Sequence, residues 1–521
     1  MQHMQPADGL PVVAIGSQPL TIDAVCRVAR RESVAMLSTD PGFRQRIERG
    51  ARFLADRLAN GEPVYGVTTG YGDSCTTEIP RELLEELPRH LVRYHGCGSG
   101  RLLDAPQVRA VLAARLNSLA QGYSAVRWEL LEQLAALLRH DLLPAVPEEG
   151  SVGASGDLTP LSYIAAALVG EREVFRNGEL VSAATALREA GLAPITLAPK
   201  EGLALMNGTS VMTGLICLAW ERADYLSRLS CRITALAVRA LRGNPKHFDA
   251  GLFAAKPHAG QMQAAAWIRE DMAGAEGDNP VRIQDRYSLR CAPHVIGVLR
   301  DALGWMKRDI ENELNSANDN PLVDPDTLTI HHGGHFYGGH IAFVADSMKN
   351  AVANLADLLD RQLALLVDTN YNHGLPANLS GATGSRAPLN HGLKAVQIAV
   401  SAWTAEALKL TMPASVFSRS TECHNQDKVS MGTIAARDAL RVIELVEQVA
   451  AASLFAACQA LEIRRRRGEL AGALNADLQD MLDEVFGLCG FVEEDRRLDH
   501  GLGELCRALR EQRFQLRGES S

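Results

Sequence analysis

Long series of apolar residues at helical spacing occupy the second half of this chain. Apolar side chains recur every three or four residues over positions 296–314, 348–366 and 442–455. This spacing places them along one face of an α-helix. Aromatic residues make up only 5% of the chain, and the alternating runs typical of strands are few. The sequence therefore predicts a mainly α fold, in which long helices with wide apolar faces form a central bundle.

The first part of the chain is interrupted by clusters of glycine and proline. A chain of 521 residues is too long for one ordinary core, because single cores stop growing near ~250–300 residues. Glycine and proline cluster at residues 61–72, 96–100 and 144–160, where we expect loops and short helices. We therefore predict a loop-rich N-terminal domain over residues 1–205 and a helical bundle domain over residues 206–521.

Charge and cysteine content narrow the possible partners. Lysine and arginine number 53 against 62 acidic residues, and the net charge of −9 argues against a general nucleic-acid or membrane-surface binder. The 10 cysteines form no C-x-x-C pair, so we expect reduced thiols and a cytoplasmic protein. Residues 202–220 are uncharged and long enough to span a membrane, but their polar side chains favour a buried core helix. The arginine run 464–467 is interpreted as a solvated helix face.

The tripeptide Ala154-Ser155-Gly156 offers a route to an unusual electrophile. In a compressed turn, the nitrogen of Gly156 can approach the carbonyl carbon of Ala154, and glycine tolerates the backbone angles required. Loss of water and of the Ser155 hydroxyl would leave an exocyclic methylidene conjugated to carbonyls. Ala-Ser-Gly is also a common turn, so the tripeptide alone leaves both interpretations open. A serine hydrolase is excluded, because Asp157 stands where the nucleophile elbow needs glycine.

Six motifs in order resemble those of the aromatic amino acid lyase family, over roughly residues 20–470. They are YGVTTGYG (65–72), ASGDLTPLS (154–162), LMNGT (205–209), QDRYSLRC (284–291), NDNPL (318–322) and NQDKVSMG (425–432). The family comprises histidine, phenylalanine and tyrosine ammonia-lyases and related aminomutases. The resemblance implies long, nearly parallel helices and a homotetramer with active sites built from three subunits. It also implies 4-methylideneimidazole-5-one (MIO), formed autocatalytically from residues 154–156, with no external cofactor.

The resemblance also assigns roles to individual residues. Tyr65 matches the base that removes a β-proton, although tyrosine ordinarily titrates near ~10 and must be poised by its surroundings. Arg290 matches the carboxylate binder, where a guanidinium can grip both oxygens. The remaining matches contact MIO, the amine, the carboxylate or the ring, or support those contacts: Asn207, Tyr287, Asn320, Asn425, Gln284, Gln426 and Phe336.

The family's ring-selectivity pair falls on Tyr94 and His95. Phenylalanine enzymes have two apolar residues there, the familiar tyrosine enzymes histidine then leucine, and histidine enzymes a small residue then histidine. Tyr-His matches none of these, but both side chains can hydrogen-bond, which favours a ring carrying OH or N. Asp427 resembles the tyrosine and phenylalanine enzymes and the aminomutases. We predict conversion of L-tyrosine to trans-4-hydroxycinnamate (p-coumarate) and ammonia. The alternatives are histidine to urocanate, a tyrosine 2,3-aminomutase and a phenylalanine enzyme.

Three other interpretations compete with this one. Histidines at 331, 332, 335 and 340 suggest a metal site, but MIO chemistry needs none, so we predict no metal. In the family this stretch lines the active site, which makes His335 and Tyr337 candidate neighbours of the substrate. The fumarase and aspartase group shares helical architecture but lacks the motifs around Tyr65 and Ser155. An inactive helical scaffold would show erosion at the motif positions, and we find none.

Overall fold

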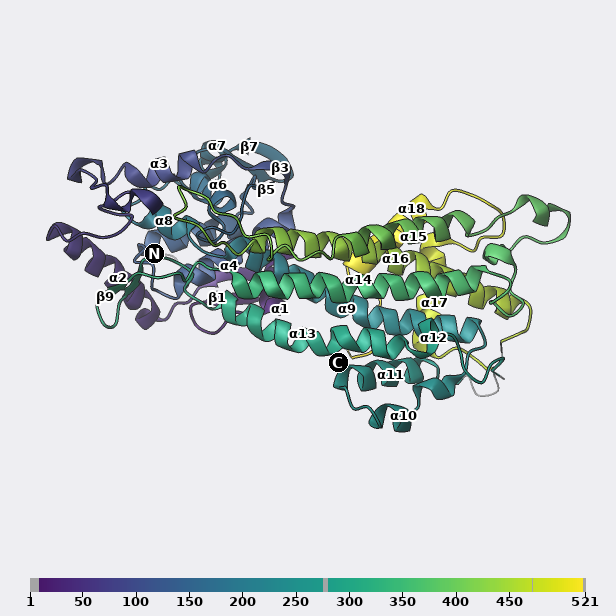
Figure 1. Ribbon diagram of the computed structural model, residues 1–521. Helices are drawn as coiled ribbons and strands as arrows, with labels where there is room; N and C mark the ends of the chain where they lie inside the picture. Colours follow the sequence, from purple (N-terminus) through teal and green to yellow (C-terminus); the bar gives the residue numbers. More distant parts are fainter. Residues whose placement is uncertain (1–8, 275–279, 471, 519–521) are drawn as a thin grey trace. The chain divides into compact units, whose positions relative to one another are not determined.

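The computed structural model describes residues 9–274, 280–470 and 472–518 (Figure 1). The described residues are mainly helical, which confirms the predicted fold class. Strands are short. β1 (Val12–Ile15) and β2 (Val34–Leu37) pair in parallel. The other pairings are antiparallel: β3 (Ser99–Leu102) with β5 (Pro147–Glu149), β4 (Leu143–Pro144) with β6 (Glu173–Arg176) and β7 (Glu179–Ser182), and β8 (Leu322–Asp324) with β9 (Thr329–His331).

The chain divides into two compact units, each assembled from segments far apart in the sequence. Unit 1 comprises Met1–Glu221, Met306–Asp346 and Pro413–Arg437. Unit 2 comprises Arg222–Trp305, Ser347–Met412 and Asp438–Ser521. Four long helices contribute residues to both units: α9 (Ser210–Ala240), α13 (Ala292–Leu314), α14 (Gly339–Val367) and α16 (Gly432–Arg466). The single boundary near residue 205 stays a prediction, because these units are not separated by one cut in the sequence.

Unit 1 is built around a buried central helix, α4 (Ala105–Ala120). Its first turn is closed by a capping box, in which Asp104 and Gln107 each accept a hydrogen bond from the other's backbone N–H at 2.9 Å. α4 contacts α1 and α5, and nearly all of its side chains from Val108 onward are buried. The other helices that lie wholly in this unit are α1 (Ile22–Ala29), α2 (Pro41–Ala59), α3 (Leu87–Tyr94), α5 (Trp128–Arg139), α6 (Leu158–Leu168), α7 (Ala183–Glu189) and α8 (Glu201–Met206), with short 3-10 helices η1 (Gly72–Thr76) and η2 (Arg81–Leu83).

Unit 2 consists of helices joined by polar side chains between their apolar faces. Arg222 of α9 binds Glu447 of α16 at 2.7 Å, and Gln362 of α14 donates to Thr234 of α9 at 2.9 Å. The remaining elements of the unit are η3 (Pro245–Phe248), α10 (Ala250–Ala254), α11 (Ala259–Asp271), α12 (Tyr287–Arg290), η4 (Ala377–Leu379), η5 (Gly384–Leu389), α15 (Lys394–Lys409), α17 (Ala476–Cys489) and α18 (Asp499–Arg510).

The apolar series found in the sequence lie on three of the long helices. Residues 296–314 lie in α13, residues 348–366 in α14 and residues 442–455 in α16. Their apolar members are buried, most of them completely. Residues 202–220 form most of α8, a short loop and the start of α9, which confirms a buried core segment entered from a polar loop. Among the described residues, no helix is both long and apolar enough to cross a membrane.

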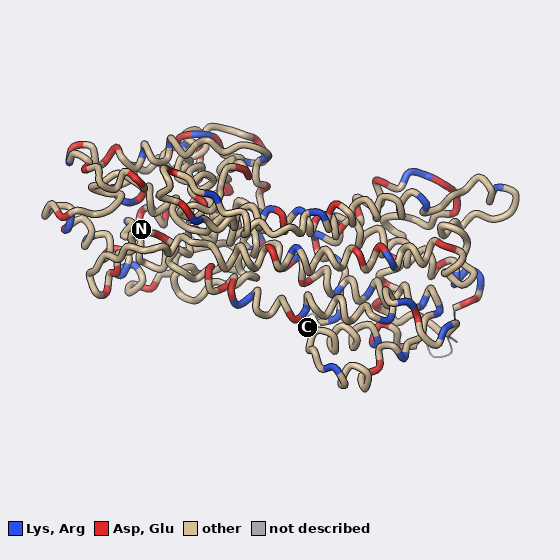
Figure 2. Tube along the Cα trace, viewed as in Figure 1, with Lys and Arg blue, Asp and Glu red and all other residues tan. Residues whose placement is uncertain are grey.

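The arginine run contains one residue that the sequence interpretation placed wrongly. Arg464 is buried, and its guanidinium donates to the carbonyl oxygens of Ala240, Asn372 and His373. Arg465 and Arg466 pair with Glu462 and remain exposed, as a solvated face would be. Backbone carbonyls left without partners at helix and loop ends explain the difference, because burying them is costly unless a donor is supplied. Elsewhere, basic and acidic residues are interspersed along both units (Figure 2).

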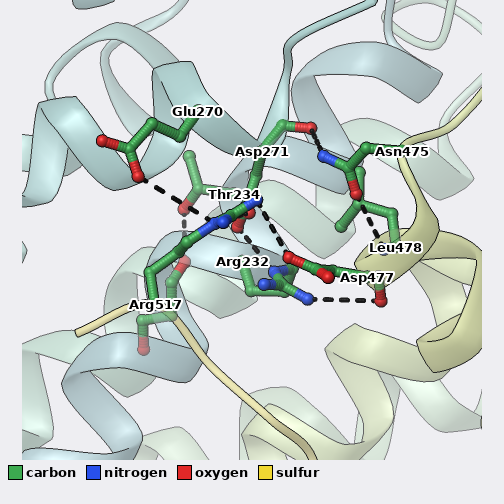
Figure 3. A network of polar contacts seen from close by, with 9 residues as sticks. Arg232, Thr234, Glu270, Asp271, Asn475, Asp477, Leu478 and Arg517 are labelled. Carbon is green, nitrogen blue, oxygen red and sulfur yellow. Dashed lines mark hydrogen bonds and ion pairs between the residues drawn. The ribbon is translucent and has the colours of Figure 1, made fainter. Parts of the chain in front are cut away.

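A buried carboxylate joins several elements of unit 2 (Figure 3). Asp271, at the end of α11, accepts from Nε of Arg232 at 2.6 Å and from Nε of Arg517 at 2.9 Å. Its backbone carbonyl accepts from the side chain of Asn475 at 3.0 Å, next to the start of α17. Arg517 also pairs with Asp477 at 3.0 Å. The network therefore ties α9, α11, α17 and the C-terminal segment to one another.

Neutralising this carboxylate is expected to destabilise the protein. In Asp271→Asn, Arg232 is left only 2% exposed beside an uncharged partner. Breaking a buried pair in this way costs about 3 kcal/mol of the free energy of unfolding. Urea unfolding followed by circular dichroism measures it. Asp357→Asn, which removes an exposed pair with Arg361, is the control and should leave the transition nearly unchanged. Equal transitions for the two variants would contradict the prediction.

Candidate active site

A cavity of about 970 Å³ in unit 1 collects most of the residues that the motifs singled out. The sequence-predicted residues that line it are Tyr65, Tyr94, His95, Ala154, Ser155, Asn207, Asn320, Phe336, Asn425 and Gln426. They come from loops and helix ends distributed over more than 350 positions of the chain. A second cavity, of about 1030 Å³ in unit 2, is lined by none of them. The first cavity is therefore the candidate active site.

The tripeptide forms a tight turn that is pressed against a neighbouring segment. Ser155 and Gly156 have φ of 51° and 81°, in the left-handed region, which is unusual for serine. The Gly156 N–H donates to the carbonyl of Gly153 at 3.3 Å, and Gly208 N–H donates to the carbonyl of Ser155 at 3.0 Å. A Cβ at position 156 would lie 2.0 Å from the carbonyl oxygen of Gly208, so only glycine fits there. The turn is thus tight and packed directly against Gly208 at the peptide where ring closure would occur.

Asp157 fixes this turn to the long helix α9. One carboxylate oxygen accepts from the backbone N–H groups of Val211 and Met212 at 2.9 and 3.0 Å, in the first turn of that helix. The other oxygen accepts from the hydroxyl of Thr433. Asp157 N–H also donates to the carbonyl of Gly208 at 2.7 Å. Burial raises the pKa of Asp157 to about 6, and these hydrogen bonds oppose that rise.

Tyr65 lies half-buried in the cavity with its hydroxyl accepting from the Gly72 N–H at 2.8 Å. Burial raises the pKa of Tyr65, because the phenolate loses water, while the Gly72 hydrogen bond acts in the opposite direction. The negative charge of Glu422 raises it further. Tyr65 therefore lies in the cavity, and the groups of unit 1 around it favour the protonated phenol.

The ring-selectivity pair closes α3 at one wall of the cavity. Nδ1 of His95 lies 3.0 Å from the carbonyl oxygen of Leu91. A carbonyl can only accept, so Nδ1 carries the proton and Nε2 of the neutral ring is left as an acceptor. Burial lowers the pKa of His95, which favours that neutral form. The Tyr94 ring lies beside it, with the ring centroids 4.4 Å apart. The pair thus presents one acceptor and one hydroxyl.

Glu422 is a cavity residue that the sequence interpretation missed. Its carboxylate accepts from the backbone N–H of Asp73 at 2.7 Å and from the side chain of Asn425 at 2.8 Å. The first contact joins two loops that are 349 positions apart in the sequence. The available signal was an acid three residues before the Asn425-Gln426 motif. Burial is the larger influence on both groups, and the charge of Glu422 adds to the raised pKa of Tyr65 and opposes the lowered pKa of His95.

Three predicted residues belong to unit 2 and do not line this cavity: Gln284, Tyr287 and Arg290. Tyr287 is 71% exposed, and its ring lies under the guanidinium of Arg290, 4.7 Å from the ring centroid. Nε of Arg290 donates to the carbonyl of Asp285 at 2.9 Å. Within the described chain, two residues of the tripeptide, Tyr65, Tyr94 and His95 line the cavity, whereas Arg290 does not.

The histidine-rich stretch supplies cavity lining rather than a ligand cluster. His332, Phe336 and Tyr337 line the cavity, whereas His335 does not. Nε2 of His331 is hydrogen-bonded to the hydroxyl of Thr329 at 2.9 Å. In the part of the chain that the structure describes, no group of three or more His, Cys, Asp or Glu could hold a metal ion.

Comparisons with known proteins agree on one family. The family described as aromatic amino acid lyase matches residues 20–484. The histidine ammonia-lyase of Burkholderia vietnamiensis is 40% identical over 449 residues, which cover 85% of this chain and 87% of that protein. The crystal structure of the tyrosine aminomutase of Streptomyces globisporus has a TM-score of 0.89 at 35% identity, covering 97% of this chain and 98% of that chain. The crystal structure of the histidine ammonia-lyase of Trypanosoma cruzi has a TM-score of 0.87 at 30% identity, covering 96% of this chain and 94% of that chain. The chain therefore belongs to the aromatic amino acid lyase family and is an enzyme, a carbon–nitrogen lyase.

Proposed function

We propose that this enzyme uses MIO to convert L-tyrosine to trans-4-hydroxycinnamate and ammonia. The observation that carries the proposal is the tight Ala154-Ser155-Gly156 turn, whose first two residues line a cavity that Tyr65 and His95 also line. Relatives named histidine ammonia-lyase and tyrosine aminomutase act on two different rings, so the ring itself is argued from the wall formed by Tyr94 and His95.

The residues present fit a MIO group formed from the tripeptide. Ring closure would join the nitrogen of Gly156 to the carbonyl carbon of Ala154. Two water molecules would leave. The first would contain the Ala154 carbonyl oxygen and the backbone N–H protons of Ser155 and Gly156. The second would contain the Ser155 hydroxyl and the Cα proton of the same residue. Oδ1 of Asn207, which lines the cavity, is buried without a partner and is available to a group placed there. MIO would supply an electrophilic carbon that no ordinary side chain offers.

The chain's own residues would carry the proton and the ring. Tyr65, as phenolate, would remove a β-proton of the substrate. The phenol oxygen of tyrosine can donate to Nε2 of His95 and accept from the hydroxyl of Tyr94 at the same time. An imidazole has its donor and acceptor on two separate ring atoms, so one point of the ring cannot satisfy both partners. Tyr94 and His95 therefore favour tyrosine over histidine as the substrate. Phenylalanine would leave both of these side chains without a hydrogen-bond partner.

The carboxylate binder is proposed to come from another copy of the chain. Arg290 and Tyr287 lie in unit 2 and do not line the cavity of unit 1. Tyr287 is largely exposed, as is expected of a residue that completes a neighbouring site. We therefore propose a homotetramer with shared active sites, in which Arg290 of one subunit binds the substrate carboxylate in the cavity of the next.

Shared sites predict complementation between inactive variants. Ser155→Ala and Tyr287→Phe should each be nearly inactive alone. Co-expressed with different tags and purified through both, they should regain activity in about a quarter of the sites, because some sites take both intact residues from different chains. The measurement is kcat per site in the mixed oligomer. Mixed oligomers no more active than either parent would contradict sharing.

The substrate is tested by supplying L-tyrosine, L-histidine and L-phenylalanine to the purified wild-type enzyme. Products are separated by chromatography, and ultraviolet absorbance follows the conjugated acids. We expect 4-hydroxycinnamate with the highest kcat/KM. Urocanate as the main product would replace the tyrosine proposal by histidine ammonia-lyase, with His95 as the imidazole partner. β-Tyrosine would place the enzyme among the aminomutases.

His95→Leu should shift the ring preference. Removing the Nε2 acceptor should lower kcat/KM for L-tyrosine about 10- to 100-fold, because the phenol loses its buried partner. It should raise kcat/KM for L-phenylalanine, because the bound phenyl ring no longer leaves Nε2 of His95 without a hydrogen-bond partner. His90→Leu, on the exposed face of the same helix, is the matched control. Parallel losses for both substrates in His95→Leu would point to a misshapen pocket instead.

A further inference from the structure

A buried ion pair lies behind the cavity, beside Asn207. Nζ of Lys200 lies 2.5 Å from Oδ2 of Asp319, and both side chains have 0% exposure. Lys200 has a φ of 79°, in the left-handed region that a residue with a side chain rarely adopts. Burial lowers the pKa of Lys200, and the attraction of Asp319 opposes that shift. Burying such a pair and holding this backbone are both costly, and costs of this kind concentrate at functional sites.

The second oxygen of Asp319 determines how the Asn207 amide is oriented. Oδ1 of Asp319 accepts from Nδ2 of Asn207 at 3.2 Å and from the backbone N–H of Asn320 at 2.7 Å. Nδ2 of Asn207 also donates to the carbonyl of Asn320 at 2.9 Å. Both of its partners are acceptors, so the amide nitrogen must face them. Oδ1 of Asn207 is then the free end, and it is the buried oxygen without a partner in the cavity-lining residue.

The backbone of Asn207 is held as tightly as its side chain. Nη1 of Arg115, which is fully buried in α4, donates to the carbonyl oxygen of Asn207 at 2.8 Å. A Cβ at Gly208 would lie 2.3 Å from the carbonyl oxygen of Asn318 and 2.7 Å from Nη1 of Arg115. With the backbone fixed, only the orientation of the side-chain amide could vary, and Asp319 sets it together with the carbonyl of Asn320.

We propose that Lys200 and Asp319 are positioning residues that hold the Asn207 oxygen toward the cavity, as an acceptor for the substrate's amine. An ionised Asp319 can only accept hydrogen bonds, so it admits one orientation of the amide. Lys200 holds the other oxygen of this carboxylate, and the carbonyl of Asn320 adds a second acceptor beside it, so a flipped amide would set its oxygen against two acceptors. This inference rests on the proposed lyase function, because it identifies the donor in the cavity as an amine.

A double-mutant cycle separates positioning from general damage. Asp319→Asn, Asn207→Ala and the double variant are compared by kcat/KM and by intact mass, which reports loss of two water molecules independently of turnover. Asp319→Asn should keep the two-water deficit and lose about 10- to 100-fold in kcat/KM. In the Asn207→Ala background the same change should have almost no further effect. Losses that multiply, or loss of the mass deficit in Asp319→Asn, would overturn the inference.

The matched control is Asp271→Asn, which removes an equally buried carboxylate outside this cavity. Its effect on kcat/KM should be small and the same in both backgrounds. If Asp319→Asn does not fold, Lys200→Met/Asp319→Asn leaves no lone buried charge and enters the cycle instead.

Failure of the proposed function is recognised separately by a binding measurement. In the Ser155→Ala background, calorimetry compares L-tyrosine with 3-(4-hydroxyphenyl)propanoate, which lacks the amine. Asp319→Asn should weaken L-tyrosine about tenfold and leave the propanoate unchanged. Equal weakening of both ligands would overturn the inference even if the wild type turned over none of the amino acids. A wild type that binds L-tyrosine without turnover contradicts the lyase proposal alone.

Discussion

Ser155→Ala is expected to abolish the mass deficit of two water molecules and to lower kcat by at least about 10³-fold. Alanine has no hydroxyl to lose, so the exocyclic methylidene cannot form. The backbone should be little affected, because the contacts of the turn are made by backbone groups of residues 153, 155 and 208. Intact-mass spectrometry and a steady-state assay on the same preparation measure the two effects.

Ser182→Ala is the control for Ser155→Ala. Ser182 is exposed and caps α7 by accepting from the N–H of Thr185, far from the cavity lining. Its removal costs some helix stability but leaves both the mass deficit and kcat unchanged. Wild-type protein with the full sequence mass, or Ser155→Ala with undiminished activity, would contradict the MIO proposal. The chain would then share the helical fold of the family without forming MIO.

Tyr65→Phe is expected to lower kcat about 10²- to 10⁴-fold while the two-water deficit is retained. The variant removes the base but not the tripeptide, so the two readouts separate. Phenylalanine keeps the ring and its packing, and only the hydroxyl that accepts from Gly72 is lost. Tyr163→Phe is a close control, because Tyr163 lies half-buried in the same unit with its hydroxyl 3.5 Å from the carbonyl of Gly98.

The pH dependence follows from the direction of the Tyr65 shift. A base works only when deprotonated, and burial raises the pKa of Tyr65, so its phenolate fraction at neutral pH is small and grows as pH rises. We expect kcat/KM of the wild type to increase between about pH 7 and 9. The substrate amine also titrates, so the residual activity of Tyr65→Phe supplies the reference profile. Identical profiles for the two proteins would contradict Tyr65 as the base.

Local pattern accounts for what the sequence predicted well. The apolar spacing of residues 348–366 needs only neighbours on one helix to be recognised, and α14 follows it. Gly156 permits the left-handed backbone that the turn adopts, but the residue types of the tripeptide alone left an ordinary turn equally open. The residues that come together in the cavity were named by the resemblance of the motifs to the family, and local pattern alone would not have grouped them.

Only the tertiary structure determines the contacts between segments that are far apart in the chain. The sequence alone indicated the helices through their period, and the resemblance to the family indicated the turn at residues 154–156 and many of the cavity-lining residues. It gave no sign that Glu422 meets Asp73, that Arg464 is buried, or that Lys200 and Asp319 pair behind Asn207. It also could not assign Arg290 to a unit outside the cavity. Such pairings depend on how the long helices pack, and spacing along one chain does not encode which distant groups must share a buried charge or hydrogen bond.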